Sequence, residues 1–293
     1  MRLLLRSNAG EFSLTKEFLG DDIIPPYAIL SHTWSEGEEV TFKDLIEGTG
    51  KNKAGYKKIQ FCGQQAEHDG LQYFWVDTCC IDKSNQVVLQ DAINSMFRWY
   101  QNARECYVYL SDVSTAKRKV SNEPSKFTWE PAFRVSRWFT RGWTLQELLA
   151  PRSVKFFSCE SKHLGDKTTL MQQICEITDI TPPALQGTPL CEFSIEERFS
   201  WTRDRQTAYK EDKAYSLLGI FNICMPLLYG EGEEKAFQRL RKKITKLSNG
   251  VKQQQALNKE DQECIQHLRL TDPRDDKKRI EETKGGLLED SYR

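Results

Sequence analysis

Four short apolar segments, each followed by polar residues, predict the strands of a buried sheet. They occupy residues 27–30, 73–76, 106–110 and 154–157. Nearly continuous apolar runs of this length are typical of strands that are covered on both faces, as in a parallel sheet. The sequence therefore predicts a mainly parallel sheet.

Helical patterns lie between these segments. The clearest is an apolar stripe with three- and four-residue spacing, formed by Leu89, Ala92, Ile93, Met96, Phe97, Tyr100 and Ala103. A weaker helix is predicted over residues 56–66, before Asp69-Gly70. This alternation of strands and helices predicts an α/β fold in which right-handed crossovers connect the strands.

The pattern changes twice towards the C-terminus. From about Ser194 it becomes helical, and a last helix after residues 230–232 has Ala236, Phe237 and Leu240 on one face. Of residues 251–293, 19 are charged and Tyr292 alone is aromatic, so this segment cannot bury enough apolar surface to pack by itself. We predict a domain over 1–250, with an α/β sheet core at 1–160, a mostly helical extension at 161–250, and a charged linker at 251–293.

Composition narrows the classes of function. Apolar residues make up 39% of the chain, and 42 basic side chains balance 42 acidic ones. A net charge of zero favours neither nucleic acid nor an anionic membrane as a partner. The sequence shows no signal-peptide core and no apolar stretch of membrane-spanning length, so we expect a cytoplasmic protein. Nine scattered Cys and four dispersed His predict reduced thiols, no metal site and no bound cofactor.

The candidate functional residues come directly after the predicted strands. Ser31, His32 and Trp34 follow the first strand, and Asp77 and Asp82 follow the second. Ligands of open parallel sheets bind beyond the carboxyl ends of the strands, which makes these side chains candidates for substrate binding. Asp and Ser also occur at strand ends simply as turn residues, and the sequence leaves that alternative open.

Four ordered sequence blocks resemble the fungal heterokaryon-incompatibility (HET) domain. They are YAILSHTW at residues 27–34, FWVDTCCIDK at 74–83, RGWTLQELLAP at 141–151, and a C-terminal segment from EDKAYSLLGIF at 211–221 to MPLLYGEG at 225–232. Ser35 departs from the glycine that is common in the family. Residues 285–293 resemble the lead-in to a NACHT nucleotide-binding module, which implies an N-terminal HET region of a longer receptor-like protein.

The resemblance implies a fold and two alternative functions. HET domains are distantly similar to Toll/interleukin-receptor (TIR) domains, which have a flavodoxin-like sheet and of which some cleave NAD. Similarity to the TIR sequence around the catalytic glutamate makes Glu147 the candidate catalytic residue, with NAD as substrate and Trp34 or Trp143 stacking on an aromatic ring. The expected role is an effector of self/non-self recognition that triggers cell death. The alternative is a non-catalytic adaptor that acts by homotypic association.

A structural role for Glu147 stays open from the residues alone. Thr144 and Glu147 have the spacing of a capping box, in which Glu147 would accept a hydrogen bond from the Thr144 backbone N–H at the start of a short helix. Such a cap contributes about 0.5–2 kcal/mol to stability and needs no substrate.

Overall fold

The structure is a computed structural model that describes residues 1–7, 10–20, 22–116 and 129–249. Met1–Leu240 forms one compact unit, and a second unit begins at Arg241. The predicted linker at 251–293 lies outside the described residues. Among the described residues, no helix is both long enough and apolar enough to cross a membrane.

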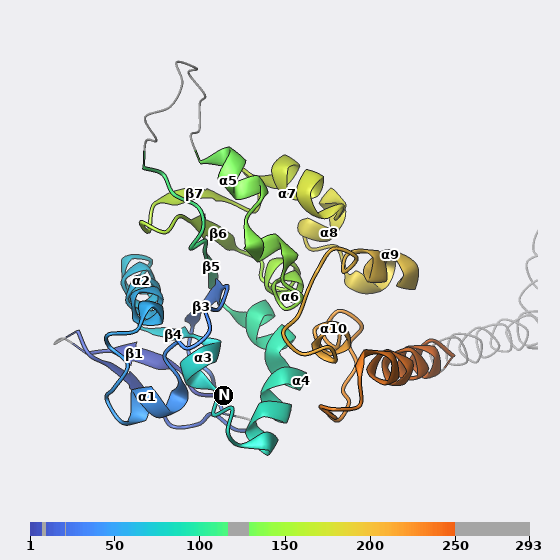
Figure 1. Ribbon diagram of the computed structural model, residues 1–293, viewed down its shortest axis with the longest axis horizontal. Coiled ribbons are helices and arrows are strands. Elements are labelled where there is room, and N and C mark those ends of the chain that lie inside the picture. The colour runs from blue at the N-terminus through green and yellow to red at the C-terminus, as the bar shows by residue number, and fades with distance from the viewer. Residues whose placement is uncertain (8–9, 21, 117–128, 250–293) are drawn as a thin grey trace, which may run out of the picture. The chain divides into compact units, whose positions relative to one another are not determined.

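A seven-stranded sheet in the order β2-β1-β4-β3-β5-β6-β7 organises the first unit (Figure 1). The strands are β1 (Leu4–Arg6), β2 (Phe12–Leu14), β3 (Tyr27–His32), β4 (Tyr73–Trp75), β5 (Glu105–Tyr109), β6 (Val154–Phe157) and β7 (His163–Asp166). Strands β4, β3, β5 and β6 pair in parallel, and they are the four strands that the sequence predicted. The α/β class and the parallel centre of the sheet are therefore confirmed.

The strands that the sequence did not predict flank the four parallel strands on either side. β1, β2 and β7 pair antiparallel with their neighbours and have only three or four residues each. β4 and β6 are equally short, but each lies in a nearly continuous apolar run of four residues with at least two aromatic side chains, which β1, β2 and β7 do not.

The order of the parallel strands determines where a ligand would bind. Numbered along the chain, they lie in the order second, first, third, fourth, so the direction of the connections reverses between β3 and β5. In doubly wound sheets such a reversal opens a crevice at the carboxyl ends of the two strands. His32 pairs with Tyr109 at this end.

Helices cover both faces of the sheet. Phe74 points towards α2 (Ala54–His68), where a Cβ on Gly63 would lie 3.2 Å from its ring. The next residue, Trp75, makes an edge-to-face contact with Tyr100 of α4 (Gln86–Asn102), with ring centroids 6.0 Å apart. Because successive side chains of a strand point to opposite faces, α2 and α4 lie on opposite sides of the sheet (Figure 1).

Both predicted helices are confirmed. Helix α4 begins where the Asn85 side chain accepts hydrogen bonds from the backbone N–H groups of Val87 and Val88, at 3.0 and 3.3 Å. Its predicted stripe is buried at Ala92, Ile93, Met96 and Tyr100. Helix α2 ends before Gly70, whose φ of 74° suits glycine.

The remaining helical elements are short. They are α1 (Phe42–Ile46), α3 (Asp77–Cys80), α5 (Glu130–Arg134), η1 (Arg137–Thr140), α6 (Thr144–Leu149), α7 (Met171–Thr178), α8 (Pro182–Leu185), η2 (Leu190–Glu192), α9 (Ile195–Ser200) and α10 (Asp212–Tyr215). Residues 233–249 are also helical, in agreement with the predicted last helix. Beyond β7, the described part of the extension therefore consists of helices and loops.

Candidate functional site

The hydroxyl of Ser31 joins two residues that are far away in the sequence. Ser31 is the fifth residue of β3 and has no exposed surface. Its Oγ donates a hydrogen bond to Oε2 of Glu147 in α6, and it accepts one from Nε1 of Trp138 at 2.8 Å. The parallel sheet thus places Glu147 at the carboxyl end of β3, on the face that α4 and α6 cover.

Burial determines the charge of Glu147, whose residue is only 7% exposed. Removal from water raises the pKa of this carboxyl group to about 8, although the hydrogen bond from Ser31 and the charge of Arg205 partly oppose the shift. Nearby Asp77 raises the pKa further. Glu147 is therefore mostly protonated at neutral pH.

The predicted capping box does not form. Helix α6 begins after Trp143 without any hydrogen bond from a capping side chain. The Thr144 hydroxyl instead lies 2.6 Å from the backbone oxygen of Trp138 and 2.8 Å from that of Arg141. The carboxyl group of Glu147 accepts a hydrogen bond from Ser31 of β3 and none from the start of its own helix.

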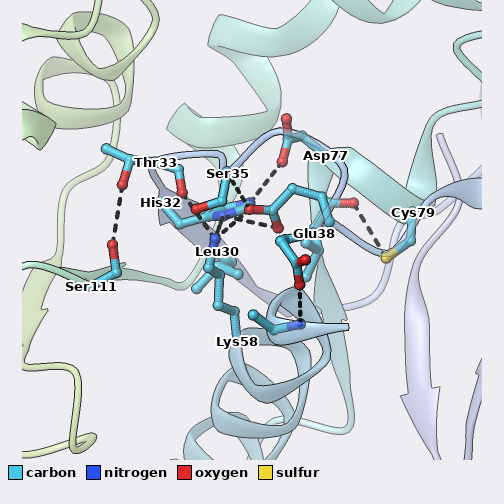
Figure 2. A network of polar contacts seen from close by, with 12 residues as sticks. Leu30, His32, Thr33, Ser35, Glu38, Lys58, Asp77, Cys79 and Ser111 are labelled. Atoms are coloured by element: carbon cyan, nitrogen blue, oxygen red, sulfur yellow. Dashed lines mark hydrogen bonds and ion pairs between the residues drawn. The ribbon is translucent and has the colours of Figure 1, made fainter. Parts of the chain in front are cut away.

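On the opposite face of β3, the ring of His32 lies between two charged side chains (Figure 2). Its Nε2 is 3.1 Å from Oδ1 of Asp77, and its Nδ1 is 3.3 Å from Nζ of Lys58. Because an ammonium group can only donate, Nδ1 accepts and the ring proton lies on Nε2, which donates to Asp77. Lys58 also donates to the backbone oxygen of Thr33 at 2.9 Å and forms an ion pair with Glu39.

Asp77 connects the buried pair of His32 and Lys58 to Lys83 at the molecular surface. Burial by itself would raise the pKa of Asp77, but the charge of Lys83 and the hydrogen bond from His32 outweigh it and hold the pKa at about 2. Lys83 lies 3.5 Å from Asp77 and 3.6 Å from the centroid of the Trp34 ring. Trp34 is 49% exposed, so its ring is available to a ligand.

At the reversal point between β3 and β5, the hydroxyls of Thr33 and Ser111 lie 3.5 Å apart (Figure 2). The carboxyl ends of β3, β4 and β5 thus bring together Ser31, His32, Trp34 and Asp77, and α6 adds Glu147. Ser31 and Glu147 lie on one face of β3, whereas His32 and Asp77 lie on the other, and a joint role in substrate binding stays a prediction.

Two further predicted residues have other partners. Asp82 accepts a hydrogen bond from the hydroxyl of Ser84 at 2.6 Å, in a local turn. Trp143 donates from Nε1 to Asp212 at 3.1 Å, which ties α6 to the C-terminal extension. Asp82 thus has the turn role that the sequence left open for aspartate at strand ends, and within the described residues neither side chain hydrogen-bonds to Ser31 or Glu147.

Comparison with known proteins identifies the family. Residues 27–133 match the family model "Heterokaryon incompatibility protein (HET)". The chain carries a HET domain. It is also 55% identical, over all of its 293 residues, to "Vegetative incompatibility protein HET-E-1" of Podospora anserina, and it spans about a fifth (20%) of that relative's length. No solved structure matches the chain.

Several residues of the candidate site were not predicted from the sequence. Trp138 and Tyr100 come from segments that look like ordinary core, and Arg205 lies in the extension. Lys58 had a detectable signal, because it is a lysine beside Ile59 on the apolar face of the α2 pattern. No sequence spacing connects Arg205 or Trp138 with Ser31, since only the tertiary fold brings them together.

The candidate site combines a protonated carboxyl group, that of Glu147, with charged side chains such as Asp77 and Lys83. Among the residues that the structure describes, no group of His, Cys, Asp and Glu could hold a metal ion. The candidate site has a neutral carboxyl group in an enclosed position, that of Glu147. At the surface it has the aromatic ring of Trp34 with the cation of Lys83. An enclosed carboxyl with a raised pKa can donate a proton, or can acquire charge when its surroundings change.

Proposed function

We propose that this chain is the effector region of a fungal heterokaryon-incompatibility protein, which triggers cell death after recognition of non-self. The HET-family match and the name of the Podospora relative support this role. The chain spans only a fifth of that relative, and the resemblance of residues 285–293 to a NACHT lead-in supports a proposed full architecture that continues into a NACHT-type module. We further propose that the protein acts in the cytoplasm and that self-association activates it.

The proposed activity is TIR-like cleavage of NAD at the bond between nicotinamide and ribose. The hydrogen bond between Ser31 and Glu147, at the carboxyl end of β3 and next to the strand-order reversal, carries this proposal. When the bond breaks, its electron pair leaves with nicotinamide, and the ribose gains oxocarbenium character. Ionised Glu147 would stabilise that charge until the oxygen of a water molecule bonds to the ribose and the water releases a proton.

The other residues of the site have distinct roles in this proposal. Ser31 and Trp138 orient the Glu147 carboxyl group, and Trp34 stacks on an aromatic ring of the dinucleotide. Because Ser31 and Glu147 are closed to solvent, substrate must reach them after a rearrangement, which self-association would drive. A raised pKa keeps Glu147 neutral until then.

One observation favours the alternative, a non-catalytic adaptor. The exposed fractions of Ser31 and Glu147 are 0% and 7%, so the pair could simply stabilise the junction of β3 and α6. In that case the domain would act through association with like domains and would recruit a separate killing activity.

Nicotinamide release from NAD by the purified, concentrated protein separates the two functions. We expect release by the natural protein, and a decrease of about 100-fold or more in Glu147→Gln, which is the scale seen when one electrostatic stabiliser is removed. The control is Glu196→Gln, which changes an exposed glutamate and should retain activity. If the natural protein kills cells on overexpression but releases no nicotinamide, or if folded Glu147→Gln kills equally well, the enzymatic proposal is wrong and the adaptor remains.

A further inference from the structure

The guanidinium group of Arg205 is buried without an anionic partner. Arg205 is 6% exposed, and within the described residues no carboxylate lies at ion-pair distance from it. Its Nη1 donates to the backbone oxygen of Arg141 at 2.8 Å and to the hydroxyl of Thr144 at 2.9 Å. Its Nη2 has no hydrogen-bond partner in the same part of the chain.

This buried cation needs a countercharge. Burial lowers the pKa of Arg205 to about 10, which leaves the side chain positively charged at neutral pH. A charge on the carboxyl group of Glu147 would raise the pKa of Arg205, but Glu147 has a pKa of about 8 and is mostly neutral under the same conditions. Buried charges in proteins are normally paired, because an isolated charge in the interior is strongly unfavourable.

A pocket that Arg205 lines could receive the missing anion. Its volume is about 200 Å³, and Thr202, Arg203, Lys213, Ser216 and Glu233 also contribute to its wall. The lining thus contains three cationic side chains, those of Arg203, Arg205 and Lys213. It contains one carboxylate, that of Glu233, which pairs with Lys213 at 3.2 Å. Arg203 is exposed and forms no ion pair with a described residue, so the pocket has an excess of positive charge.

We propose that this pocket binds the phosphate group of a small anionic metabolite, with Arg205 at its base and Arg203 and Lys213 at its mouth. Arginine suits this role because its planar donors match phosphate oxygens. The hydroxyls of Thr202 and Ser216 add polar groups to the lining, although without a ligand they donate to the backbone oxygens of Phe199 and Lys213, at 2.8 and 3.3 Å. The volume is below the roughly 300–1,000 Å³ of pockets for drug-sized ligands, so it accommodates a phosphoryl group rather than a whole dinucleotide. This site does not depend on NAD cleavage at Glu147.

Calorimetric titration of the full chain with inorganic phosphate, pyrophosphate and adenosine diphosphate, at constant ionic strength, tests the proposal. We expect saturable binding that weakens by about 10-fold or more in Arg203→Gln, because one charge-assisted contact is lost. Equal affinities for phosphate and the nucleotide would identify the phosphoryl group alone as the ligand. Tighter binding of the nucleotide would show that the bound group belongs to a nucleotide.

Matched variants exclude nonspecific attraction by basic side chains. Arg152→Gln removes an exposed arginine outside the pocket lining and should leave the affinity unchanged. Lys213→Gln should weaken binding like Arg203→Gln, which keeps the test decisive if Arg205→Gln does not fold. Absence of saturable binding up to millimolar ligand, or equal weakening in Arg152→Gln and Arg203→Gln, would overturn the proposal.

Discussion

The environment of Glu147 shows how a single residue combines an effect on stability with a candidate role in chemistry. An exposed glutamate would be ionised at neutral pH, whereas this one is enclosed and bonded to Ser31. Two of its neighbours have opposite effects on its pKa, since the charge of Arg205 lowers it and that of Asp77 raises it. The same carboxyl group therefore makes the stability of the protein depend on pH.

Glu147→Gln should change that pH dependence in a defined direction. The pKa of Glu147 is about 8 in the folded protein and 4.5 in an exposed glutamate, so the folded protein keeps a proton that the unfolded chain loses over this range. Its free energy of unfolding should therefore fall with rising pH between those values, with a slope of about 1.4 kcal/mol per pH unit from this group. Urea unfolding at several pH values should show that Glu147→Gln lacks this component. Parallel profiles for the two proteins would contradict the raised pKa.

Lys83→Gln should make the protein more sensitive to acid. The depressed pKa of Asp77 contributes stability that is present above its ordinary pKa and is lost as pH falls towards about 2. Without the Lys83 charge, burial raises the pKa of Asp77, and the loss should begin at higher pH. Acid unfolding followed by circular dichroism measures the shift of the midpoint. Lys57→Gln, at an exposed position of α2, is the control and should leave the midpoint unchanged.

At the scale of elements, helix α6 is held by side chains from distant segments instead of by a local cap. The buried Thr144 hydroxyl contacts two backbone oxygens and also accepts a hydrogen bond from Arg205. Its neighbour Trp143 is bonded to Asp212 of α10. The start of α6 is therefore a junction between the sheet and the C-terminal extension.

Thr144→Val should destabilise this junction by about 1–3 kcal/mol, because it leaves buried polar groups without partners. Thr144→Ser retains the hydroxyl and should cost less than Thr144→Val. Chemical denaturation of the two variants gives the comparison. A smaller loss in Thr144→Val, which retains the methyl group, than in Thr144→Ser would show that the methyl group of Thr144, and not its hydroxyl, stabilises the start of α6.

At the scale of the whole molecule, we expect the folded domain to be independent of residues 251–293. Their composition cannot bury enough apolar surface to contribute a core. A chain that ends at residue 250 should therefore unfold cooperatively, with a thermal midpoint within about 4 °C of the full chain, which corresponds to less than about 1 kcal/mol. Loss of the cooperative transition on truncation would show that the predicted domain boundary is wrong.

The sequence by itself determined the central architecture, because its signals are local. Buried faces are indicated directly by the apolar runs at 27–30 and 106–110 and by the apolar stripe on α4. The outer strands β1 and β7 were not predictable, since neither lies in a nearly continuous apolar run that contains aromatic side chains and their pairing depends on distant neighbours.

Only the tertiary structure decided how the candidate residues are connected. Sequence position placed Ser31, Asp77 and Glu147 near strand ends, but it left open whether Glu147 caps its own helix or crosses to β3. That choice depends on contacts over 116 residues and on the exclusion of water around the carboxyl group. The buried charge of Arg205 likewise has no local signal, because an arginine in the sequence looks the same whether it lies in solvent or against a pocket. Long-range packing and desolvation arise only in the folded chain, and they decide the chemistry of this site.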